Sequence, residues 1–275
     1  MFDTANLESI VTSASFTVDN GEVPVTIANA PGSARDERKG AVEEREITAH
    51  DVRSIADQFD MDREGFAFMN CTSEMKDFFD EEQVKSVYYP EMENLVAGVT
   101  GASKVVVFDH TIRVADEAKR EEMELRPPVR AMHNDFTIRS AEQRVRDLLP
   151  ADEAEARLKK RFGSVNVWRP LRGPVENLPL AICGWDSLAD ADMIVSERRY
   201  EDRIGGILST AYNSDQRWVY FSQMQRHEVV LLKCYDSLTD GTARWTAHGT
   251  FDLPGAATDS APRESIEIRT MMFWD

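Results

Sequence analysis

A histidine and an aspartate stand two positions apart in the stretch AMHNDFT, residues 131–137. Side chains two positions apart in a β-strand point to the same face of a sheet. If this stretch is a strand, His133 and Asp135 offer an imidazole nitrogen and a carboxylate oxygen to one point. That pair is half of a metal site. The alternative is a polar interruption in an ordinary strand, since His-x-Asp triplets also occur by chance.

A third histidine and an Arg-x-Ser pair follow much later in the chain. His248 lies in TAHGTFDLP, and Arg263 and Ser265 lie at the start of the next apolar stretch. Two histidines and one carboxylate on one face of a metal hold Fe(II) and leave positions open for a chelating cosubstrate and oxygen. An arginine and a serine on one strand face would supply a forked donor and a hydroxyl to a carboxylate. The other histidines are His50, His110 and His227.

This order resembles the HxD...H...RxS signature of Fe(II)/2-oxoglutarate dioxygenases. The resemblance implies a double-stranded β-helix, which is a cupin-like jelly roll. It also implies Fe(II), 2-oxoglutarate and O2 as cofactors.

The elements around these residues favour an all-β core with added helices. Eight apolar stretches read as strands, and their irregular spacing favours an antiparallel sandwich or barrel over a Rossmann fold. The predicted strands are 104–113, 129–137, 164–171, 178–185, 217–224, 227–236, 243–253 and 264–274, with helices at 140–149 and 151–161. We expect one domain over residues 1–275, made of an irregular segment 1–46, a helix and strand extension 47–103 and a jelly-roll core 104–274.

Two further features are predicted. A weak alternation of apolar residues favours an edge hairpin around Asn20 and Gly21, followed by a mobile loop over 31–46. The loop over 186–215, with Gly205 and Gly206 as a flexible pivot, and part of 47–103 would form a lid over the mouth of the barrel. The alternative is that 47–103 packs against the outside of the barrel.

Composition excludes several function classes. The chain has 275 residues, a formal charge of −17 and 42% hydrophobic residues, which describes a globular protein with an acidic surface. Such a surface repels phosphate groups, so neither nucleic acid nor an anionic membrane is expected as a partner. The sequence has no apolar run long enough to span a bilayer and no signal-peptide pattern at its start, so we expect a cytoplasmic protein. The three cysteines are too far apart for a CxxC metal site.

Longer phrases carry a more specific resemblance. VFDHTIR, HNDFT, NVWRPLRGPVENLPLAICGWDS, RWVYF, EVVLLKCYDS and AHGTFDLP...RESIEIR are similar to those of the CmcJ/NvfI-like oxidoreductases. This group includes gibberellin desaturase-like and AsaB-like proteins, and the similarity runs from about residue 47 to 274. Membership implies non-haem iron chemistry, a hydroxylation or desaturation, on a small molecule of secondary metabolism.

The resemblance also assigns residues. It makes His133, Asp135 and His248 the catalytic iron ligands and Arg263 the anchor of the 2-oxoglutarate carboxylate. Many relatives have His-Arg-Trp where this chain has Gln216-Arg217-Trp218, and this departure strengthens His248 as the third ligand.

Several residues have two interpretations. Ser265 is expected beside the cosubstrate with Arg263, and Asn166 and Trp168, which share a strand face, line the same pocket or belong to the core. Arg269 is the rival anchor. The remaining candidates are Lys233, either a carboxylate contact or a structural salt bridge, and His110, either a substrate contact or a structural residue.

The rival functions are a non-catalytic jelly-roll accessory protein that assists a tailoring enzyme, and a Zn or Mn cupin-like enzyme. A complete set of ligands argues against the first, and the lack of a His-rich cluster argues against the second. The expected partner is a small-molecule substrate, with a homodimer as the oligomer to test.

Overall fold

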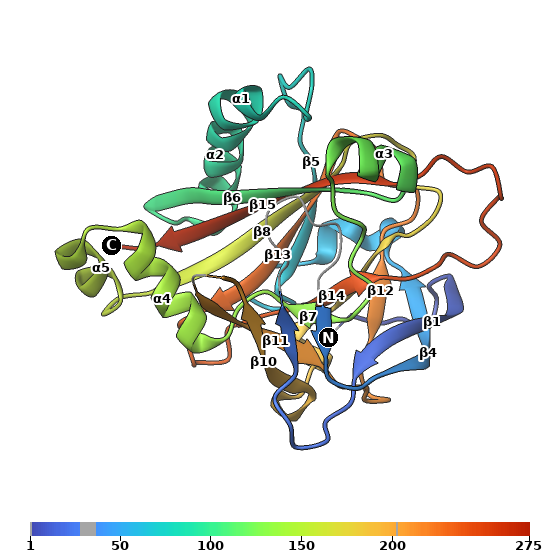
Figure 1. Ribbon diagram of the computed structural model, residues 1–275, viewed down its shortest axis with the longest axis horizontal. Helices are drawn as coiled ribbons and strands as arrows, with labels where there is room; N and C mark the ends of the chain where they lie inside the picture. The colour runs from blue at the N-terminus through green and yellow to red at the C-terminus, as the bar shows by residue number, and fades with distance from the viewer. Residues whose placement is uncertain (1, 28–36, 202) are drawn as a thin grey trace.

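Two β-sheets pack against each other to form the body of the protein (Figure 1). The computed structural model describes residues 2–27, 37–201 and 203–275. Trp168 and Val230 from one sheet meet Ile182 and Val219 from the other in a common core. Burying each such side chain contributes about 1.5–3 kcal/mol, so this core holds the two sheets together.

The five-stranded sheet is entirely antiparallel. Its middle strand is buried along its whole length. Val165 and Val167 face the outer, helix-covered side, while Trp168 faces the core between the sheets, as strand alternation requires. The order of the strands is β5 (Phe66–Asn70), β13 (Glu228–Asp236), β8 (Phe162–Pro170), β15 (Glu264–Phe273) and β6 (Lys104–Val114).

The ten-stranded sheet is mixed, because β4 pairs parallel with β12 and β2 pairs parallel with β10. Its short central strands carry two of the three candidate ligands. The order of the strands is β1 (Ser9–Thr17), β4 (Val42–Asp51), β12 (Trp218–Tyr220), β9 (Leu180–Cys183), β14 (Ala247–Thr250), β7 (His133–Asn134), β11 (Ile204–Thr210), β10 (Met193–Arg199), β2 (Val25–Ile27) and β3 (Glu37–Lys39).

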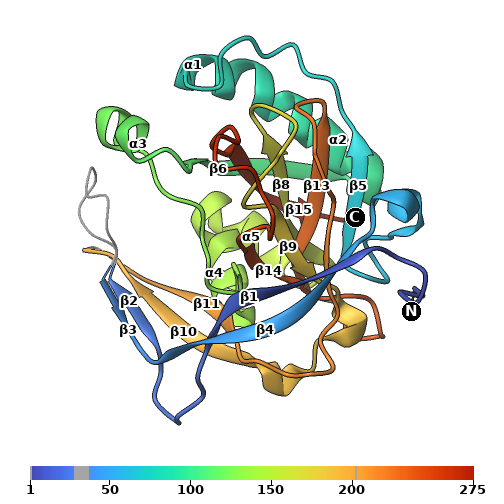
Figure 2. The same ribbon diagram turned by 90° about the vertical axis from the view of Figure 1, so that its right-hand side faces the viewer.

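The helices cover the outside and one end of this pair of sheets. Met92 and Val96 of α2 (Tyr89–Thr100) pack on the outer face of the five-stranded sheet, with α1 (Glu81–Gln83) and the π-helix η2 (Val84–Tyr88) before them (Figure 2). Helices α4 (Ile138–Leu148) and α5 (Ala151–Arg157) cover one end of the core. The remaining helices are η1 (Arg53–Gln58), α3 (Glu117–Met123), η3 (Trp185–Ser187) and η4 (Asp190–Asp192). In the part of the chain that the structure describes, no helix is both long and apolar enough to cross a membrane.

The prediction of an irregular segment over residues 1–46 is wrong. Strand β1 pairs with β4 along its whole length, and β4 continues the ten-stranded sheet through β12. The hairpin expected around Asn20 and Gly21 is therefore replaced by a long-range pairing. Of the mobile loop expected over 31–46, residues 31–36 lie outside the described residues, and Val42 already belongs to β4.

Two more expectations are corrected, on the loop 186–215 and on the strand 129–137. The loop predicted over 186–215 contains β10 and β11, which form an antiparallel hairpin inside the ten-stranded sheet. The extension 47–103 packs on the outer face of the five-stranded sheet through α2, and its strand β5 pairs with β13 at the edge of that sheet. The strand predicted over 129–137 is real only at His133 and Asn134.

Candidate metal centre

His133, Asp135 and His248 come together in the structure. Strands β7 and β14 are neighbours, and their pairing places His133 directly opposite His248, with 4.7 Å between the ring centroids. The Nε2 atom of His133 lies 3.4 Å from Oδ1 of Asp135. One candidate ligand atom from each of the three residues lies within 4.8 Å of the others. The donor set is two imidazole nitrogens and one carboxylate oxygen, which suits Fe(II).

The orientation of the two imidazoles is set by backbone carbonyls. His133 donates from Nδ1 to the carbonyl of Ala131 at 2.9 Å, and Nδ1 of His248 lies 3.4 Å from the carbonyl of Thr246. These contacts leave both Nε2 atoms free for a metal. The Nε2 atom of His248 is buried and has no hydrogen-bond partner among the residues that the structure describes. A buried polar atom without a partner is costly, and a metal ion at this point would supply one.

The charges of the site favour metal binding as well. Burial, together with the nearby His133, lowers the pKa of His248 to about 4, so its imidazole is neutral at neutral pH. Burial raises the pKa of Asp135, but the charge of Arg269, the hydrogen bond and charge of His133 and the charge of His248 together outweigh it and hold that pKa well below its usual range. Metal ligands must be deprotonated, and both groups meet this requirement.

The chain after Asp135 is fixed by the start of α4. Thr137 is the N-cap of α4 and accepts a hydrogen bond from the backbone of Ser140 at 3.0 Å. The hydroxyl of Ser140 donates to the carbonyl of Gly206 in β11 at 2.7 Å. This cap ties the start of the helix to the sheet, and it therefore limits how far the Asp135 carboxylate can move.

Arg263, the predicted cosubstrate anchor, packs against Trp168. Its guanidinium lies 5.5 Å from the centroid of the Trp168 ring, and its Nη1 donates to Thr250 Oγ1 at 2.6 Å and to the carbonyl of Leu178 at 2.5 Å. Its Nε is buried without a partner. Burial, with a smaller effect from the charge of Arg113, lowers the pKa of Arg263 to about 9. Among the residues that the structure describes, Arg263 forms no ion pair, and a buried guanidinium of this kind is a suitable anchor for a carboxylate.

Thr250 was missed in the sequence. It stands two positions after His248 in β14, so alternation puts both side chains on one face of that strand. The signal was therefore present in the motif HGT. Ser265 is buried in β15 opposite Pro170 of β8, and its expected place beside the cosubstrate stays a prediction.

Asn166 and Arg269 both contact Asp135. Asn166 donates from its amide to Asp135 Oδ2 at 2.7 Å, and Arg269 donates from Nε to the same oxygen at 2.9 Å. The amide donor of Asn166 therefore points at a candidate ligand, whereas the sequence placed this residue along the cosubstrate pocket. Arg269 has carboxylate partners within the protein, unlike Arg263.

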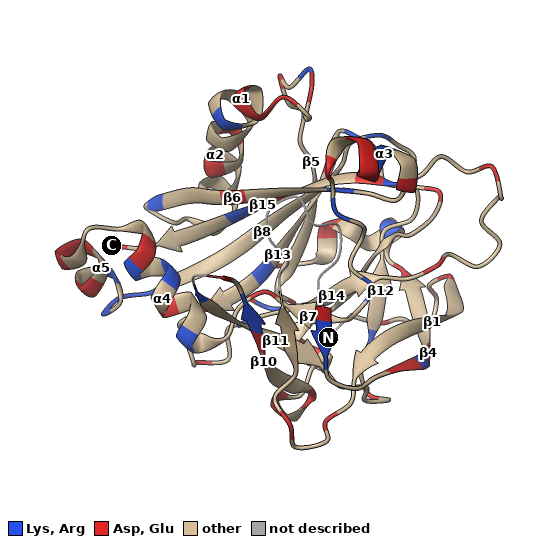
Figure 3. Cartoon of the chain, viewed as in Figure 1, with Lys and Arg blue, Asp and Glu red and all other residues tan. Residues whose placement is uncertain are grey.

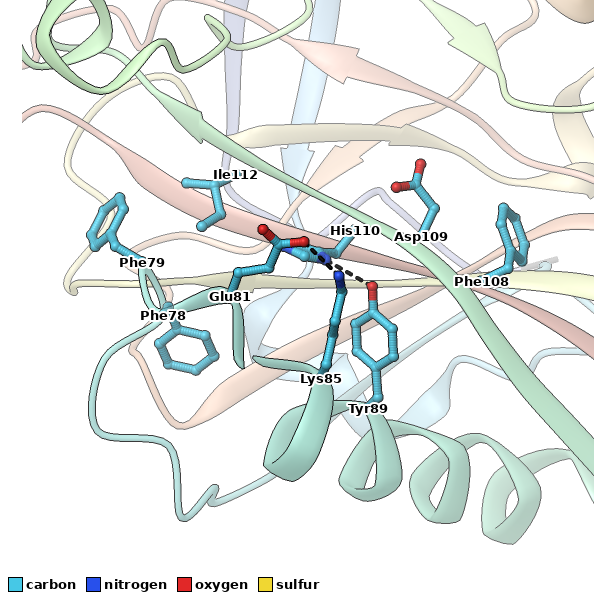
Figure 4. Close-up of a pocket in the computed structure, with 9 residues that line it drawn as sticks. All are labelled: Phe78, Phe79, Glu81, Lys85, Tyr89, Phe108, Asp109, His110 and Ile112. Carbon is cyan, nitrogen blue, oxygen red and sulfur yellow. Dashed lines mark hydrogen bonds and ion pairs between the residues drawn. The ribbon is translucent and has the colours of Figure 1, made fainter. Parts of the chain in front are cut away.

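Other candidates lie outside this cluster. His110 shares a hydrogen bond of 2.8 Å between its Nδ1 and the Tyr89 hydroxyl, in a surface pocket of about 460 Å³ whose mouth holds Glu81 and Lys85 (Figure 4). Lys233 is buried and forms ion pairs with Asp62 and Asp236. Of its two interpretations, the structural salt bridge therefore holds. The three remaining residues also lie away from the cluster: Gln216 binds Asp192, His227 is exposed and His50 is on β4.

The model of the oxidoreductase/YMDC permease-like domain matches residues 14–273. This chain belongs to that oxidoreductase family. The match covers both sheets of the structure, including β15, and places the protein among enzymes.

Individual relatives agree with this assignment. The chain is 33% identical to the hydroxylase/desaturase efuI of Hormonema carpetanum over 83% of each chain. It is 32% identical to the Fe(II)/2-oxoglutarate-dependent dioxygenase nvfI of Aspergillus novofumigatus over 82% of each chain. The solved structure of the iron and alpha-ketoglutarate-dependent endoperoxidase NvfI matches with a TM-score of 0.84 and 26% identity, covering 97% of this chain and 98% of that chain. The predicted family and the predicted jelly-roll fold are confirmed.

Proposed function

We propose that this protein is an Fe(II)/2-oxoglutarate-dependent oxygenase whose iron ligands are His133, Asp135 and His248. The observation that carries the proposal is the buried, unpartnered Nε2 of His248 within 4.8 Å of the other two ligand atoms. A set of two histidines and one carboxylate leaves coordination positions for a chelating cosubstrate and oxygen. The relatives named as dioxygenases and hydroxylase/desaturases support the same reaction class.

When bound, Fe(II) and 2-oxoglutarate would supply, together with O2, the two-electron oxidation of the substrate. 2-Oxoglutarate loses CO2 and takes one oxygen atom of O2 to become succinate, and the other oxygen atom leaves in the hydroxylated product or, in a desaturation, as water. The residues of the chain bind the cosubstrate and fix its orientation. Arg263 pairs with the distal carboxylate of 2-oxoglutarate, Thr250 holds the guanidinium in place and Trp168 forms a wall beside it. Ser265, one strand alternation after Arg263, adds a hydroxyl on the same side.

The substrate we propose is a small molecule of secondary metabolism, which is hydroxylated or desaturated, as the name of efuI indicates for that relative. We propose that the chain works as a single domain in the cytoplasm, alone or as a homodimer. Acidic and basic side chains are mixed along α3, α4 and α5, and no basic stripe follows these helices (Figure 3). This distribution, with a net charge of −17, argues against nucleic acid as a partner.

The test is metal-dependent consumption of 2-oxoglutarate by protein loaded anaerobically with Fe(II). The wild-type protein is expected to bind one iron and to form succinate. His133→Ala, Asp135→Ala and His248→Ala are each expected to lose iron and turnover with an unchanged circular dichroism spectrum, because each removes a metal bond without opening a large cavity. His227→Ala, at an exposed histidine, is the matched control and should behave as wild type.

Two results would contradict the proposal. Wild-type protein that binds iron but forms no succinate with a wide set of substrates would favour the accessory-protein alternative. Full activity in His248→Ala would remove this residue from the ligand set.

A further inference from the structure

The two oxygens of the Asp135 carboxylate have different surroundings. Oδ1 faces Nε2 of His133 at 3.4 Å, on the side of the histidine cluster. Oδ2 accepts two hydrogen bonds, one from Arg269 Nε at 2.9 Å and one from Asn166 Nδ2 at 2.7 Å. Side chains of the protein therefore hydrogen-bond to Oδ2, while Oδ1 faces the histidines.

Arg269 is held in this position by three strands. Its Nη1 donates to Thr111 Oγ1 at 2.8 Å and lies 3.3 Å from Asp109 Oδ2, and its Nη2 donates to Glu267 at 2.5 Å. Its backbone on β15 pairs with Asp109 of β6 on one side and with Asn166 of β8 on the other. Each of its three guanidinium nitrogens donates to a protein oxygen, so the group is fixed in orientation.

The electrostatics agree with this arrangement. Burial disfavours a charged guanidinium, but the carboxylates of Glu267, Asp135 and Asp109 outweigh it and raise the pKa of Arg269. Asn166 is completely buried, and the hydrogen bond to Asp135 is the one its amide nitrogen makes. A charged and a neutral donor thus converge on one carboxylate oxygen in a low-dielectric environment, where such bonds are strong.

We propose that Arg269 and Asn166 are positioning residues that hold Asp135 so that it offers the metal Oδ1 alone. A carboxylate that bound through both oxygens would occupy a further coordination position. Keeping Oδ2 engaged leaves that position for the cosubstrate and oxygen. The proposal rests on the proposed function in taking Asp135 as a metal ligand, and it gives Arg269 a task different from that of Arg263.

The experiment measures metal binding without turnover. Apo protein is titrated anaerobically with Co(II), in the absence of 2-oxoglutarate, and the visible absorption of the bound ion is recorded. Arg269→Gln is expected to lower Co(II) affinity by about 10- to 100-fold and to change the absorption spectrum. Asn166→Ala removes one of the two hydrogen bonds and leaves the ion pairs, so a smaller loss in the same direction is expected.

A matched control separates positioning from general loss of an ion pair. Arg53 forms an ion pair with the buried Glu228, away from the three ligand residues, and Arg53→Gln is expected to leave Co(II) affinity and spectrum as in wild type. Thermal unfolding of each apo variant identifies variants that do not fold. If Arg269→Gln does not fold, Asn166→Ala decides.

Two outcomes would overturn the inference. The first is wild-type Co(II) affinity and spectrum in folded Arg269→Gln and in Asn166→Ala. The second is an unchanged Co(II) affinity with a large loss of 2-oxoglutarate binding to the metal-loaded Arg269→Gln protein, which would make Arg269 the cosubstrate anchor. Failure of the proposed function gives a different result. A wild-type protein that forms no succinate contradicts the proposed function, whereas the Co(II) affinity of the variants, measured without 2-oxoglutarate, decides whether Arg269 and Asn166 position Asp135.

Discussion

At the scale of single residues, the contrast between Arg263 and Arg269 decides which arginine has a place for an external anion. Both belong to the same part of the chain and both are largely buried. Arg269 has Asp135 and Glu267 as partners, and its pKa is raised by these carboxylates in spite of burial. Burial lowers the pKa of Arg263, which in the described part of the chain has a hydroxyl and a carbonyl as acceptors. The carboxylate of a bound cosubstrate would give Arg263 a negatively charged partner.

The substitution Arg263→Lys tests this directly. An ammonium group cannot form the forked pair of hydrogen bonds that a guanidinium forms with a carboxylate. Loss of one charged hydrogen bond should weaken 2-oxoglutarate binding roughly 10- to 100-fold. Isothermal titration of metal-loaded protein under anaerobic conditions measures it. Unchanged 2-oxoglutarate affinity, or a loss of metal affinity instead, would show that the anchor is another residue.

The sequence predicted the cluster of ligands better than it predicted their neighbours. The His-x-Asp spacing and the order of the motifs predicted that His133, Asp135 and His248 come together, although β7 ends at Asn134, before Asp135. The contact between Asn166 and Asp135 was out of reach, because it depends on how β8 pairs with β15 and where the chain turns after β7. Segments so far apart in sequence leave no local pattern that reports their contact.

At the scale of elements, the edge strand β6 contacts both β15, through Asp109, and α2, through His110. Arg269 pairs with Asp109 and Thr270 pairs with Val107, so Phe108 is an extra residue on β6. Such bulges re-aim side chains at sheet edges. In this case Asp109 turns toward Arg269, while His110 points toward Tyr89 of α2, as Figure 4 shows for the His110 and Tyr89 side chains. His110 therefore joins α2 to the sheet instead of reaching the metal cluster.

This contact should make stability depend on pH. Burial lowers the pKa of His110, and the charges of Lys85 and Arg269 add to this effect, while those of Asp109 and Glu81 oppose it. Because the folded pKa lies below the unfolded value, His110 contributes stability above the unfolded pKa near 6.5, and this is lost as pH falls through the folded pKa. Urea unfolding at pH 7 and pH 5 should show a smaller loss of unfolding free energy for His110→Gln than for wild type.

The control for this prediction is His227→Gln, at an exposed histidine that precedes β13. It should keep the wild-type difference between the two pH values. Equal pH dependence in wild type and His110→Gln would mean that His110 does not couple α2 to the sheet through its charge state.

The hairpin of β10 and β11 shows why a lid was predicted where a strand pair lies. Adjacent glycines suggested a pivot, yet a Cβ atom at Gly206 would lie 3.0 Å from Thr137 Oγ1. The glycine is there because the N-cap of α4 packs closely on β11. Glycine occurs both in flexible hinges and where two backbone segments pack closely, so the glycine pair in the sequence does not distinguish a hinge from a closely packed strand.

At the scale of the whole molecule, the N-terminal strands are part of the main sheet. Along β1 the buried positions include Ala14 and Phe16, while Val11 is 56% exposed. Apolar residues thus stand on both faces of this edge strand, which weakens the alternation that reveals a strand. Its partner β4 is separated from it by a polar stretch of the sequence, and this long-range pairing explains why the segment was predicted to be irregular.

The last prediction concerns this strand. The Phe16 side chain is fully buried, and its ring packs edge-on against Tyr212 and Trp218 with centroid distances of 5.4 and 5.6 Å. Phe16→Ala should therefore lower the free energy of unfolding by about 3–5 kcal/mol, the usual cost of a large cavity in a core. Val11→Ala, on the same strand but exposed, should cost about 0.5 kcal/mol or less. Urea unfolding followed by tryptophan fluorescence measures both. Equal, small losses in the two variants would mean that β1 pairs with the sheet without belonging to the cooperative core.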